Sequence, residues 1–208
     1  MARRFCGTLA LMIDAMHIRR AGEYVEWLRQ QVHEMDVPAS TRIRAAGGCL
    51  ALAQEHHHSI VFLIENCLYG SAFALVRIAF DAYVRGVWLS LCAADSVADG
   101  FMHGQEPPKI DVLLAQLEET PAFSERVLSG IKRRTWRAMC DYTHTGGLHV
   151  QRWNTSDAIE PNYDDAEILE VLKFAELIGS LSVIGLAQLA GDDELGIRVL
   201  EQVTGRAV

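Results

Sequence analysis

Charged residues at helical spacing form the first candidate site in the sequence. Arg77, Asp81 and Arg85 stand at i, i+4 and i+8 within an otherwise apolar segment, so a helix would place them on one stripe. Charges on a buried helix must be paired or face a cleft, because burying them unpaired is costly. Two interpretations stay open: a structural ion-pair ladder, or one wall of an anion- or nucleotide-binding cleft in which arginine donates to the ligand.

A local excess of positive charge marks the second candidate site. The chain carries a net charge of −8, which argues against general attraction to nucleic acid or anionic lipid. Residues 126–152 nevertheless form a basic segment, in which Asp141 is the only acidic residue. Its basic residues are Arg126, Lys132, Arg133, Arg134, Arg137 and Arg152. The segment is either a solvated helix face or a phosphate-binding surface, with Arg133 and Arg134 as candidate binding residues.

Histidine chemistry is indicated near the end of the same segment. Arg137 and His144 are seven residues apart, so they point in nearly the same direction if one helix includes both. A histidine can transfer a proton near neutral pH, and an arginine can neutralise the charge that develops on a phosphate. We therefore predict that Arg137 and His144 line one cleft as candidate catalytic residues, together with Tyr142.

Three consecutive histidines follow Glu55 and invite a metal-site interpretation. The spacing from Glu55 to His58 matches half of a di-iron site, but the sequence contains no second Glu-x-x-His. On a helix, His56, His57 and His58 would fan out by about 100° each, so they cannot converge on one ion. We predict no metal and no cofactor, and the role of these histidines stays open.

Compartment and secretion signals are also readable from the sequence. The five cysteines never form a Cys-x-x-Cys pair, which favours buried reduced thiols over disulfides or a zinc site. Asp14 interrupts the apolar run that follows Arg3 and Arg4, which argues against a signal peptide. The longest charge-free run, residues 177–191, is shorter than the roughly 20 residues that span a bilayer. We predict a cytoplasmic protein with no membrane partner.

Helical periodicity runs through the chain, and alternating strand patterns are absent. The predicted fold class is all-α: a bundle of four or five long helices with short additional helices. We expect a single domain over residues 1–208, with an N-terminal helical segment (1–38), a core bundle (40–190) and a short C-terminal helix (191–208). The expected helices are residues 2–35, 41–69 capped by Ser40 or Thr41, 71–94 after a stop at Gly70, 111–119, 121–142, 165–190 ended by Gly191, and 193–203. An irregular connection over residues 144–163 is long enough to be functional.

Three stretches together resemble a group of bacterial helical proteins of about this size that have no assigned function. The stretches are Glu55-His56 through Ala72 to Leu75, Arg77 through Asp81 to Trp88, and Tyr142-Thr143-His144-Thr145-Gly146-Gly147. The resemblance covers residues 45–190 and implies no established activity.

The chain also distantly resembles the HEPN superfamily of helical bundles, many of which are metal-independent ribonucleases in toxin–antitoxin and phage-defence systems. That resemblance implies a homodimer, with the family's arginine at Arg137 and its histidine at His144. The implied reaction is attack of an RNA 2′-hydroxyl on the adjacent phosphate, with histidine in acid–base catalysis and arginine on the phosphate. The sequence departs from the family pattern at Ala138, where a polar residue commonly follows the arginine, and at Gly146, which interrupts the helix soon after the histidine.

Two functions therefore remain open. The first is a HEPN-like endoribonuclease or nucleotide-binding protein that acts as a homodimer, with RNA or a nucleotide as partner. The second is a non-catalytic helical module that binds a small anionic ligand or a protein partner, through the stripe of Arg77, Asp81 and Arg85. A metal-dependent hydrolase is disfavoured by the poor spacing of the histidines.

Overall fold

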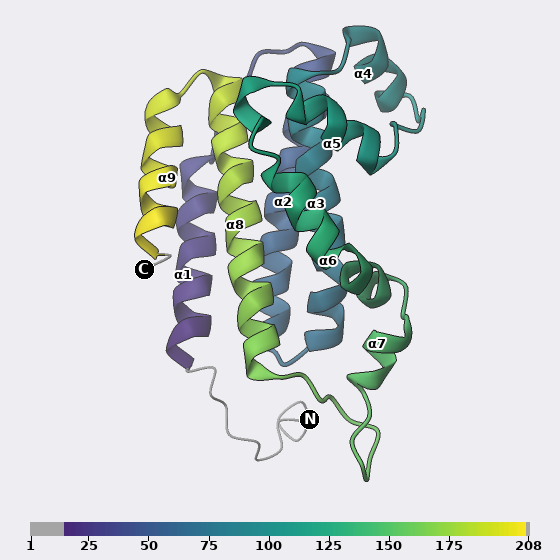
Figure 1. Ribbon diagram of the computed structural model, residues 1–208. Coiled ribbons are helices and arrows are strands. Elements are labelled where there is room, and N and C mark those ends of the chain that lie inside the picture. Colours follow the sequence, from purple (N-terminus) through teal and green to yellow (C-terminus); the bar gives the residue numbers. More distant parts are fainter. Residues whose placement is uncertain (1–14, 207–208) are drawn as a thin grey trace.

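The computed structural model describes residues 15–206, and this part of the chain consists of helices joined by turns and loops (Figure 1). The predicted all-α fold class is confirmed. The elements are α1 (Ala15–Gln31), α2 (Thr41–Glu65), α3 (Tyr69–Leu91), α4 (Asp95–Met102), α5 (Ile110–Glu118), the 3₁₀ turn η1 (Pro121–Phe123), α6 (Val127–Thr143), α7 (Gly147–Gln151), α8 (Asp165–Ala190) and α9 (Asp193–Arg206). The start of the predicted N-terminal helix, residues 2–14, lies outside the described residues. None of the described helices combines the length and apolar composition needed to cross a bilayer.

Helices α2, α3 and α8 form the centre of the bundle, because each carries apolar residues on several faces. Leu50 of α2 is buried where the three helices meet. The approach is close because Gly86 of α3 and Gly185 of α8 have no side chains. A Cβ at Gly86 would lie 2.7 Å from Leu50 Cγ, and one at Gly185 would lie 2.9 Å from Leu50 Cδ1. These two glycines therefore help to set the helix spacing on which the outer elements depend.

Helices α1 and α9 flank α8 on one side of the bundle (Figure 1). Their apolar residues enclose a small core cluster with α8, which includes Leu28, Val183 and Leu195. The Tyr24 hydroxyl of α1 shares a hydrogen bond of 2.8 Å with Ser180 Oγ of α8, so a buried polar pair is satisfied within this cluster. The candidate arginines and His144 lie elsewhere, on α3 and α6.

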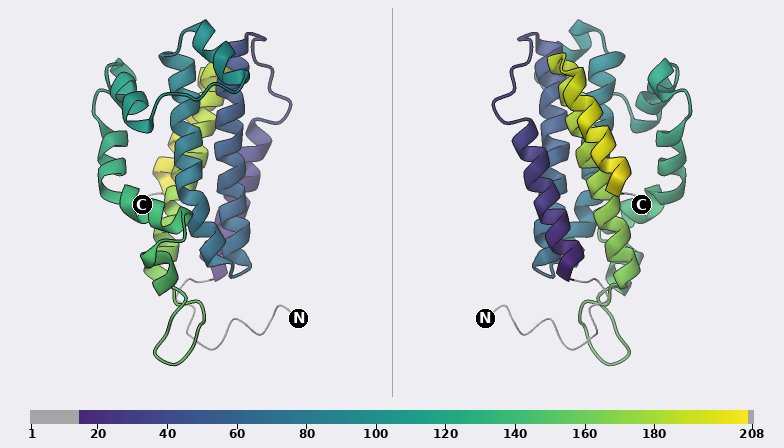
Figure 2. Two further views of the ribbon diagram at one scale, coloured as in Figure 1. Left: turned by 90° about the vertical axis from the view of Figure 1, so that its right-hand side faces the viewer. Right: turned by 90° about the vertical axis from the view of Figure 1, so that its left-hand side faces the viewer.

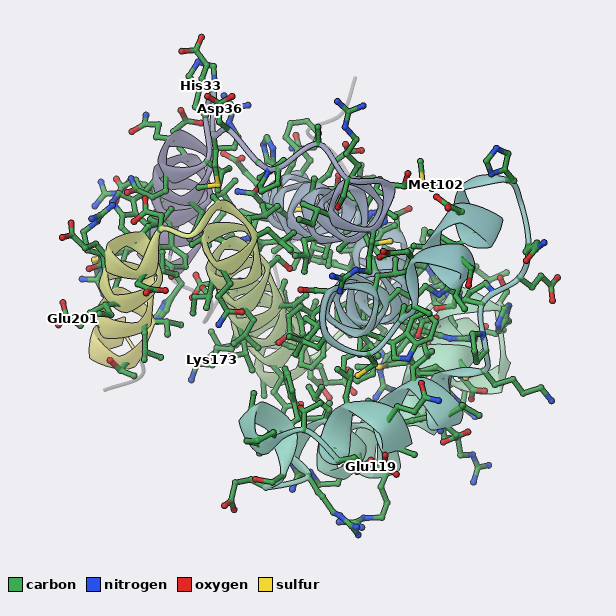
Figure 3. All side chains as sticks on the ribbon, turned by 90° about the horizontal axis from the view of Figure 1, so that it is seen from above. His33, Asp36, Met102, Glu119, Lys173 and Glu201 are labelled. Carbon is green, nitrogen blue, oxygen red and sulfur yellow. The ribbon has the colours of Figure 1, made fainter. Side chains whose placement is uncertain are left out.

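Helices α5 to α7 form an outer layer on another side of the bundle, and α4 packs against α2 near the end of the central helices (Figure 2). Helix α6 packs against α3, and α7 packs against α6, whereas α6 and α8 make few direct contacts. Seen from above, Glu201 of α9 lies at the left and Glu119 after α5 at the bottom, so the two residues are on different sides of the molecule (Figure 3). Helix α6 thus presents one side to α3, and a pocket separates another side from α8.

The turn between α2 and α3 lies earlier than predicted. The sequence predicts the stop at Gly70, but the turn occupies residues 66–68, with Cys67 in a left-handed conformation (φ 59°). Gly70 instead lies in the first turn of α3. A Cβ at that position would sit 3.1 Å from His149 Nε2, so the glycine serves close packing rather than helix termination.

Other helix ends agree with the predictions more closely. Ser40 caps α2 by accepting a hydrogen bond from Ile43 N (3.3 Å), and Gly191 ends α8 in the left-handed conformation (φ 75°). The start predicted for the helix 121–142 is wrong, however, because only a 3₁₀ turn forms at Pro121 and α6 starts after Arg126, whose φ is 55°. The connection after α6 also contains the short helix α7, and α9 continues three residues beyond the predicted end.

Candidate functional site

Arg77 and His144 come together where α3 meets the end of α6. Arg77 Nη1 lies 2.6 Å from His144 Nε2, although the two residues are 67 positions apart in the chain. An arginine side chain can only donate hydrogen bonds, so His144 Nε2 is the acceptor and the ring proton is on Nδ1. The imidazole is therefore neutral in this arrangement, and a lone pair on an exposed ring is directed at a guanidinium.

The Trp136 ring of α6 lies against two cations. Its centroid is 4.6 Å from Arg77 Cζ and 4.7 Å from Lys132 Nζ, distances at which the face of an indole attracts a positive charge. Lys132 also pairs with Asp111 of α5, with Nζ 2.8 Å from Oδ1. The residues Arg77, Asp81, Lys132, Trp136 and His144 are referred to below as the Arg77–His144 cluster.

Asp81 neutralises Arg77 only in part. Arg77 Nε lies 3.7 Å from Asp81 Oδ2, which is too long for a hydrogen bond. Among the described residues, Arg77 Nε and Asp81 Oδ1 are buried without a hydrogen-bond partner. Burial raises the pKa of Asp81, and the positive charges of Arg77, Arg85 and Lys132 oppose that rise. Arg85 forms no ion pair within the described part of the chain, so the predicted ladder contains one ion pair rather than two.

The turn after α6 positions His144 through local hydrogen bonds. Thr143 Oγ1 donates to the carbonyl oxygen of Ala74 on α3 (3.0 Å), which attaches the end of α6 to that helix. Asp141 then accepts a backbone hydrogen bond of 3.4 Å from the first turn of α7. A Cβ at Gly146 would lie 2.6 Å from Asp141 Oδ1, so this turn requires glycine. The stretch of residues 142–147 is thus a structural unit that presents the imidazole to α3.

No hydrogen bond joins His144 to its predicted partner in the described part of the chain. Arg137 is exposed on α6 and makes no hydrogen bond or ion pair with any described residue. The guanidinium beside His144 belongs to Arg77, which the sequence analysis assigned to a different candidate site. Arg133 and Arg134 are also exposed on α6. The structure therefore joins one residue from each predicted site, and it leaves the other arginines of α6 on the outer surface.

Tyr142 packs into the interior rather than beside His144. Its ring is 9% exposed and makes edge-on contacts with Phe73, at 4.9 Å between centroids, and with His149, at 5.4 Å. Burial raises the pKa of Tyr142, which favours the neutral phenol. In this position the tyrosine lines a pocket on a different side of α6 from the cluster.

The three consecutive histidines of α2 point in different directions, as helix geometry predicts. His57 is fully buried and lies so close to Gly179 of α8 that any Cβ there would collide with its ring. His58 is exposed, and His56 is half-buried with its pKa lowered by burial. Within residues 15–206, no group of three His, Cys, Asp or Glu side chains is arranged to hold a metal ion.

Two members of the cluster had no individual role in the sequence analysis. Lys132 and Trp136 stand four residues apart, and this spacing puts both on one side of a helix. The sequence therefore indicated that these two side chains lie together on α6. It does not indicate which helix the two side chains meet, because the crossing of α6 over α3 is a property of the tertiary packing.

Comparison with known proteins identifies a family without an activity. The model of the family of unknown function DUF6988 matches residues 50–204, a range that contains every member of the Arg77–His144 cluster. No curated protein matches the chain significantly, and neither does any solved structure. The geometry of the cluster is therefore the basis for assigning a function.

Proposed function

Since the chain belongs to the family of unknown function DUF6988, we propose its function from the Arg77–His144 cluster: the cluster binds a small anionic ligand that carries a phosphate group. The observation that carries this proposal is the 2.6 Å contact between Arg77 Nη1 and the exposed His144. A neutral imidazole occupies the position at the guanidinium where a phosphate oxygen would form a stronger, charge-assisted hydrogen bond.

Ligand binding would exchange one acceptor for another. A phosphate oxygen gains a hydrogen bond to a charged donor on Arg77, worth about 1.5–3 kcal/mol, and displaces His144. The released imidazole can take up a proton and donate to the same phosphate. A phosphate suits this arrangement better than a carboxylate, because it offers enough oxygen atoms for guanidinium, imidazolium and ammonium donors on different elements.

Two features of the cluster keep Arg77 available for a ligand. Trp136 supports the guanidinium through its ring face, which consumes no hydrogen-bond donor. Asp81 lies too far away for a hydrogen bond to Arg77 Nε. The exposed Arg133 and Arg137 add positive charge around this part of an otherwise acidic protein, which attracts anions to this surface.

Calorimetric titration with inorganic phosphate and with adenosine monophosphate tests the binding site. Arg77→Met retains an apolar stem beside Trp136 but removes the donors, and we expect it to bind at least about tenfold more weakly, as the loss of a charged hydrogen bond requires. Arg198→Gln, at an exposed position of α9, is the matched control and should bind like the wild type. Equal binding by Arg77→Met and the wild type would refute the proposal, as would a wild type that binds neither probe.

A second candidate function is metal-independent cleavage of RNA, because the same contact joins an imidazole to the guanidinium that we propose binds phosphate. In this version Arg77 takes the role that the sequence analysis gave to Arg137. His144 would accept the proton of the RNA 2′-hydroxyl while that oxygen bonds to the adjacent phosphorus. The bond from phosphorus to the 5′-oxygen breaks, and the products are a 2′,3′-cyclic phosphate and a 5′-hydroxyl that has taken up a proton.

The partner and setting implied by the HEPN resemblance belong to this second candidate. They are a homodimer that brings two copies of the cluster together, and a cytoplasmic role of the toxin or phage-defence type. Light scattering coupled to size-exclusion chromatography measures the mass in solution. A monomer at assay concentrations would reject the hypothesis that two copies of the cluster act together in a homodimer.

An RNA cleavage assay in excess chelator separates the two candidate functions. The enzyme hypothesis expects wild-type cleavage with cyclic-phosphate ends, and loss of that cleavage in both His144→Ala and Arg77→Met. Arg137→Ala decides between the two arginines: retained cleavage supports Arg77, and lost cleavage supports the assignment made from the sequence. A wild type that binds adenosine monophosphate without cleaving RNA would support the phosphate-binding function and reject the ribonuclease hypothesis.

A further inference from the structure

A pocket lies on another side of α6, between this helix, α3 and α8. Its volume is about 380 Å³, which is at the small end of the range for sites that bind small molecules. The apolar part of its lining includes Phe73, Val76, Met139, Tyr142, Val171 and Phe174. Such a lining favours a ligand with an apolar body, because a polar group placed there would lose its hydrogen bonds to water.

The walls of this pocket are held by contacts of their own. Phe73 and Tyr142 pack edge to face with ring centroids 4.9 Å apart, and both are buried. Thr135 Oγ1 donates to the carbonyl oxygen of Ile131 (2.9 Å) and lies 3.6 Å from Met139 Sδ, so its polar atom is satisfied within α6. The interior of the pocket is therefore mainly apolar, and the hydroxyl of Thr135 does not need a hydrogen bond from a ligand.

Three charged residues also line the pocket: Arg134 of α6, and Glu167 and Glu170 of α8. Glu167 is neutralised by Arg152, which binds both of its carboxylate oxygens. Arg134 and Glu170 are exposed, and neither forms an ion pair or hydrogen bond with any residue of the described chain. An unpaired cation and an unpaired carboxylate thus face the pocket from two different helices.

We propose that this pocket binds an α-amino acid with a large apolar side chain in its zwitterionic form. The side chain occupies the apolar interior, the carboxylate binds Arg134 and the ammonium binds Glu170. This site is independent of the phosphate site, since it shares no residue with the Arg77–His144 cluster. The volume suits one amino acid rather than a peptide or a large cofactor.

The pair of opposite charges selects the zwitterion over simpler amphiphiles. An apolar carboxylic acid could bind Arg134 but would leave the carboxylate of Glu170 unpaired and close to its own negative charge. An apolar amine could bind Glu170 but would leave Arg134 unpaired in the same way. A ligand with both groups on one carbon atom satisfies the two residues at once and leaves neither charge opposed.

Matched ligands test this assignment by calorimetric titration of the full chain. The probes are L-phenylalanine, phenethylamine, which lacks the carboxylate, and 3-phenylpropionate, which lacks the ammonium. We expect L-phenylalanine to bind the wild type about tenfold or more tightly than either analogue, because each analogue loses one charged hydrogen bond and leaves one charge unpaired. Equal or tighter binding of an analogue would overturn the proposal, and so would a wild type that binds none of the three at millimolar concentration.

Variants at the two charges should remove the two preferences separately. Arg134→Gln should bind phenylalanine and phenethylamine alike, and Glu170→Gln should bind phenylalanine and 3-phenylpropionate alike. Lys173→Gln, an exposed neighbour on α8, is the control and should retain both preferences. Ala138→Leu adds bulk to the pocket lining and should weaken all binding while circular dichroism confirms the helical fold. Unchanged preferences in both charge variants, or unchanged affinity in Ala138→Leu, would place the ligand elsewhere.

Discussion

Two sides of helix α6 differ in the kind of residue that they carry. The side that faces α3 holds Lys132 and Trp136, and it collects charges that are incompletely neutralised. An adjoining side holds Ala138 and Tyr142, and it is apolar except for the charged residues that line the same pocket. The side chains on the charged side can form new hydrogen bonds with a ligand at the surface, whereas those on the aromatic side are held in place by contacts between rings.

This difference separates the residues that stabilise α6 from those proposed to bind phosphate. Burial of apolar surface contributes about 25 cal/mol per Å², while an exposed ion pair contributes about 0–1 kcal/mol. We therefore expect substitutions on the aromatic side to change the free energy of unfolding, and substitutions on the charged side to change phosphate binding with little loss of stability.

The largest effect is expected from Phe73→Ala, which removes a ring that packs against both Tyr142 and Tyr163. Phe73 is 2% exposed, and truncation of a buried phenylalanine costs about 3–5 kcal/mol because it leaves a cavity. Urea unfolding followed by circular dichroism measures the loss. Phe62→Ala is the control, since Phe62 is 57% exposed, and it should cost about 1 kcal/mol or less. Similar losses in the two variants would contradict the assignment of stability to this side.

A smaller effect is expected at the turn that presents His144. Gly146→Ala puts a Cβ 2.6 Å from Asp141 Oδ1 and 2.9 Å from Asp141 Cα, and relief of such overpacking costs about 1–3 kcal/mol. Gly147→Ala is the matched neighbour, because a Cβ there meets nothing within 4 Å. Thermal unfolding should show a lower midpoint for the first variant only. The affinity for phosphate should also be lower in this variant. A wild-type affinity in Gly146→Ala would show that the turn does not contribute to phosphate binding.

The pH dependence of stability tests whether Asp81 is a satisfied ion-pair partner. Its pKa in the folded protein is raised from the ordinary value of 3.8, chiefly by burial. The folded state therefore holds this proton at pH values where the unfolded state has lost it, so this group's contribution to stability falls as pH rises from about 3.8 through the raised value. We expect the wild type to lose stability relative to Asp81→Asn over that window, as measured by urea unfolding at several pH values. The opposite trend would show that attraction to Arg77 outweighs burial.

The smallest effect is expected for Asp111→Asn. Asp111 pairs with Lys132 at 2.8 Å, but its side chain is 76% exposed, and such pairs contribute about 0–1 kcal/mol. The variant should unfold at nearly the wild-type urea concentration and bind phosphate slightly more tightly, because Lys132 is released towards the ligand. A loss of phosphate affinity would instead show that Asp111 is needed to hold Lys132 in place.

Much of the fold follows from local patterns that a sequence displays directly. Helical periodicity identifies the all-α class, and the capping residue Ser40 and the terminal Gly191 mark helix ends that the structure confirms. The spacing of Arg77 and Asp81 also places them on one stripe, and they pair. Local patterns were less informative at Gly70. The glycine is favoured there because His149, from a distant segment, packs closely against it, and not because a helix ends there.

The sequence by itself determined the positions of the long helices and which residues share a helix side, because hydrogen bonding and side-chain spacing within a helix are local. Only the tertiary structure decided that His144 meets Arg77 rather than Arg137. That contact joins residues 67 positions apart, and it depends on how α6 crosses α3 and on the turn at Gly146 that accompanies the crossing. The same crossing leaves the pocket between α6 and α8. Contacts of this kind arise from the packing of whole helices, and no local periodicity encodes them.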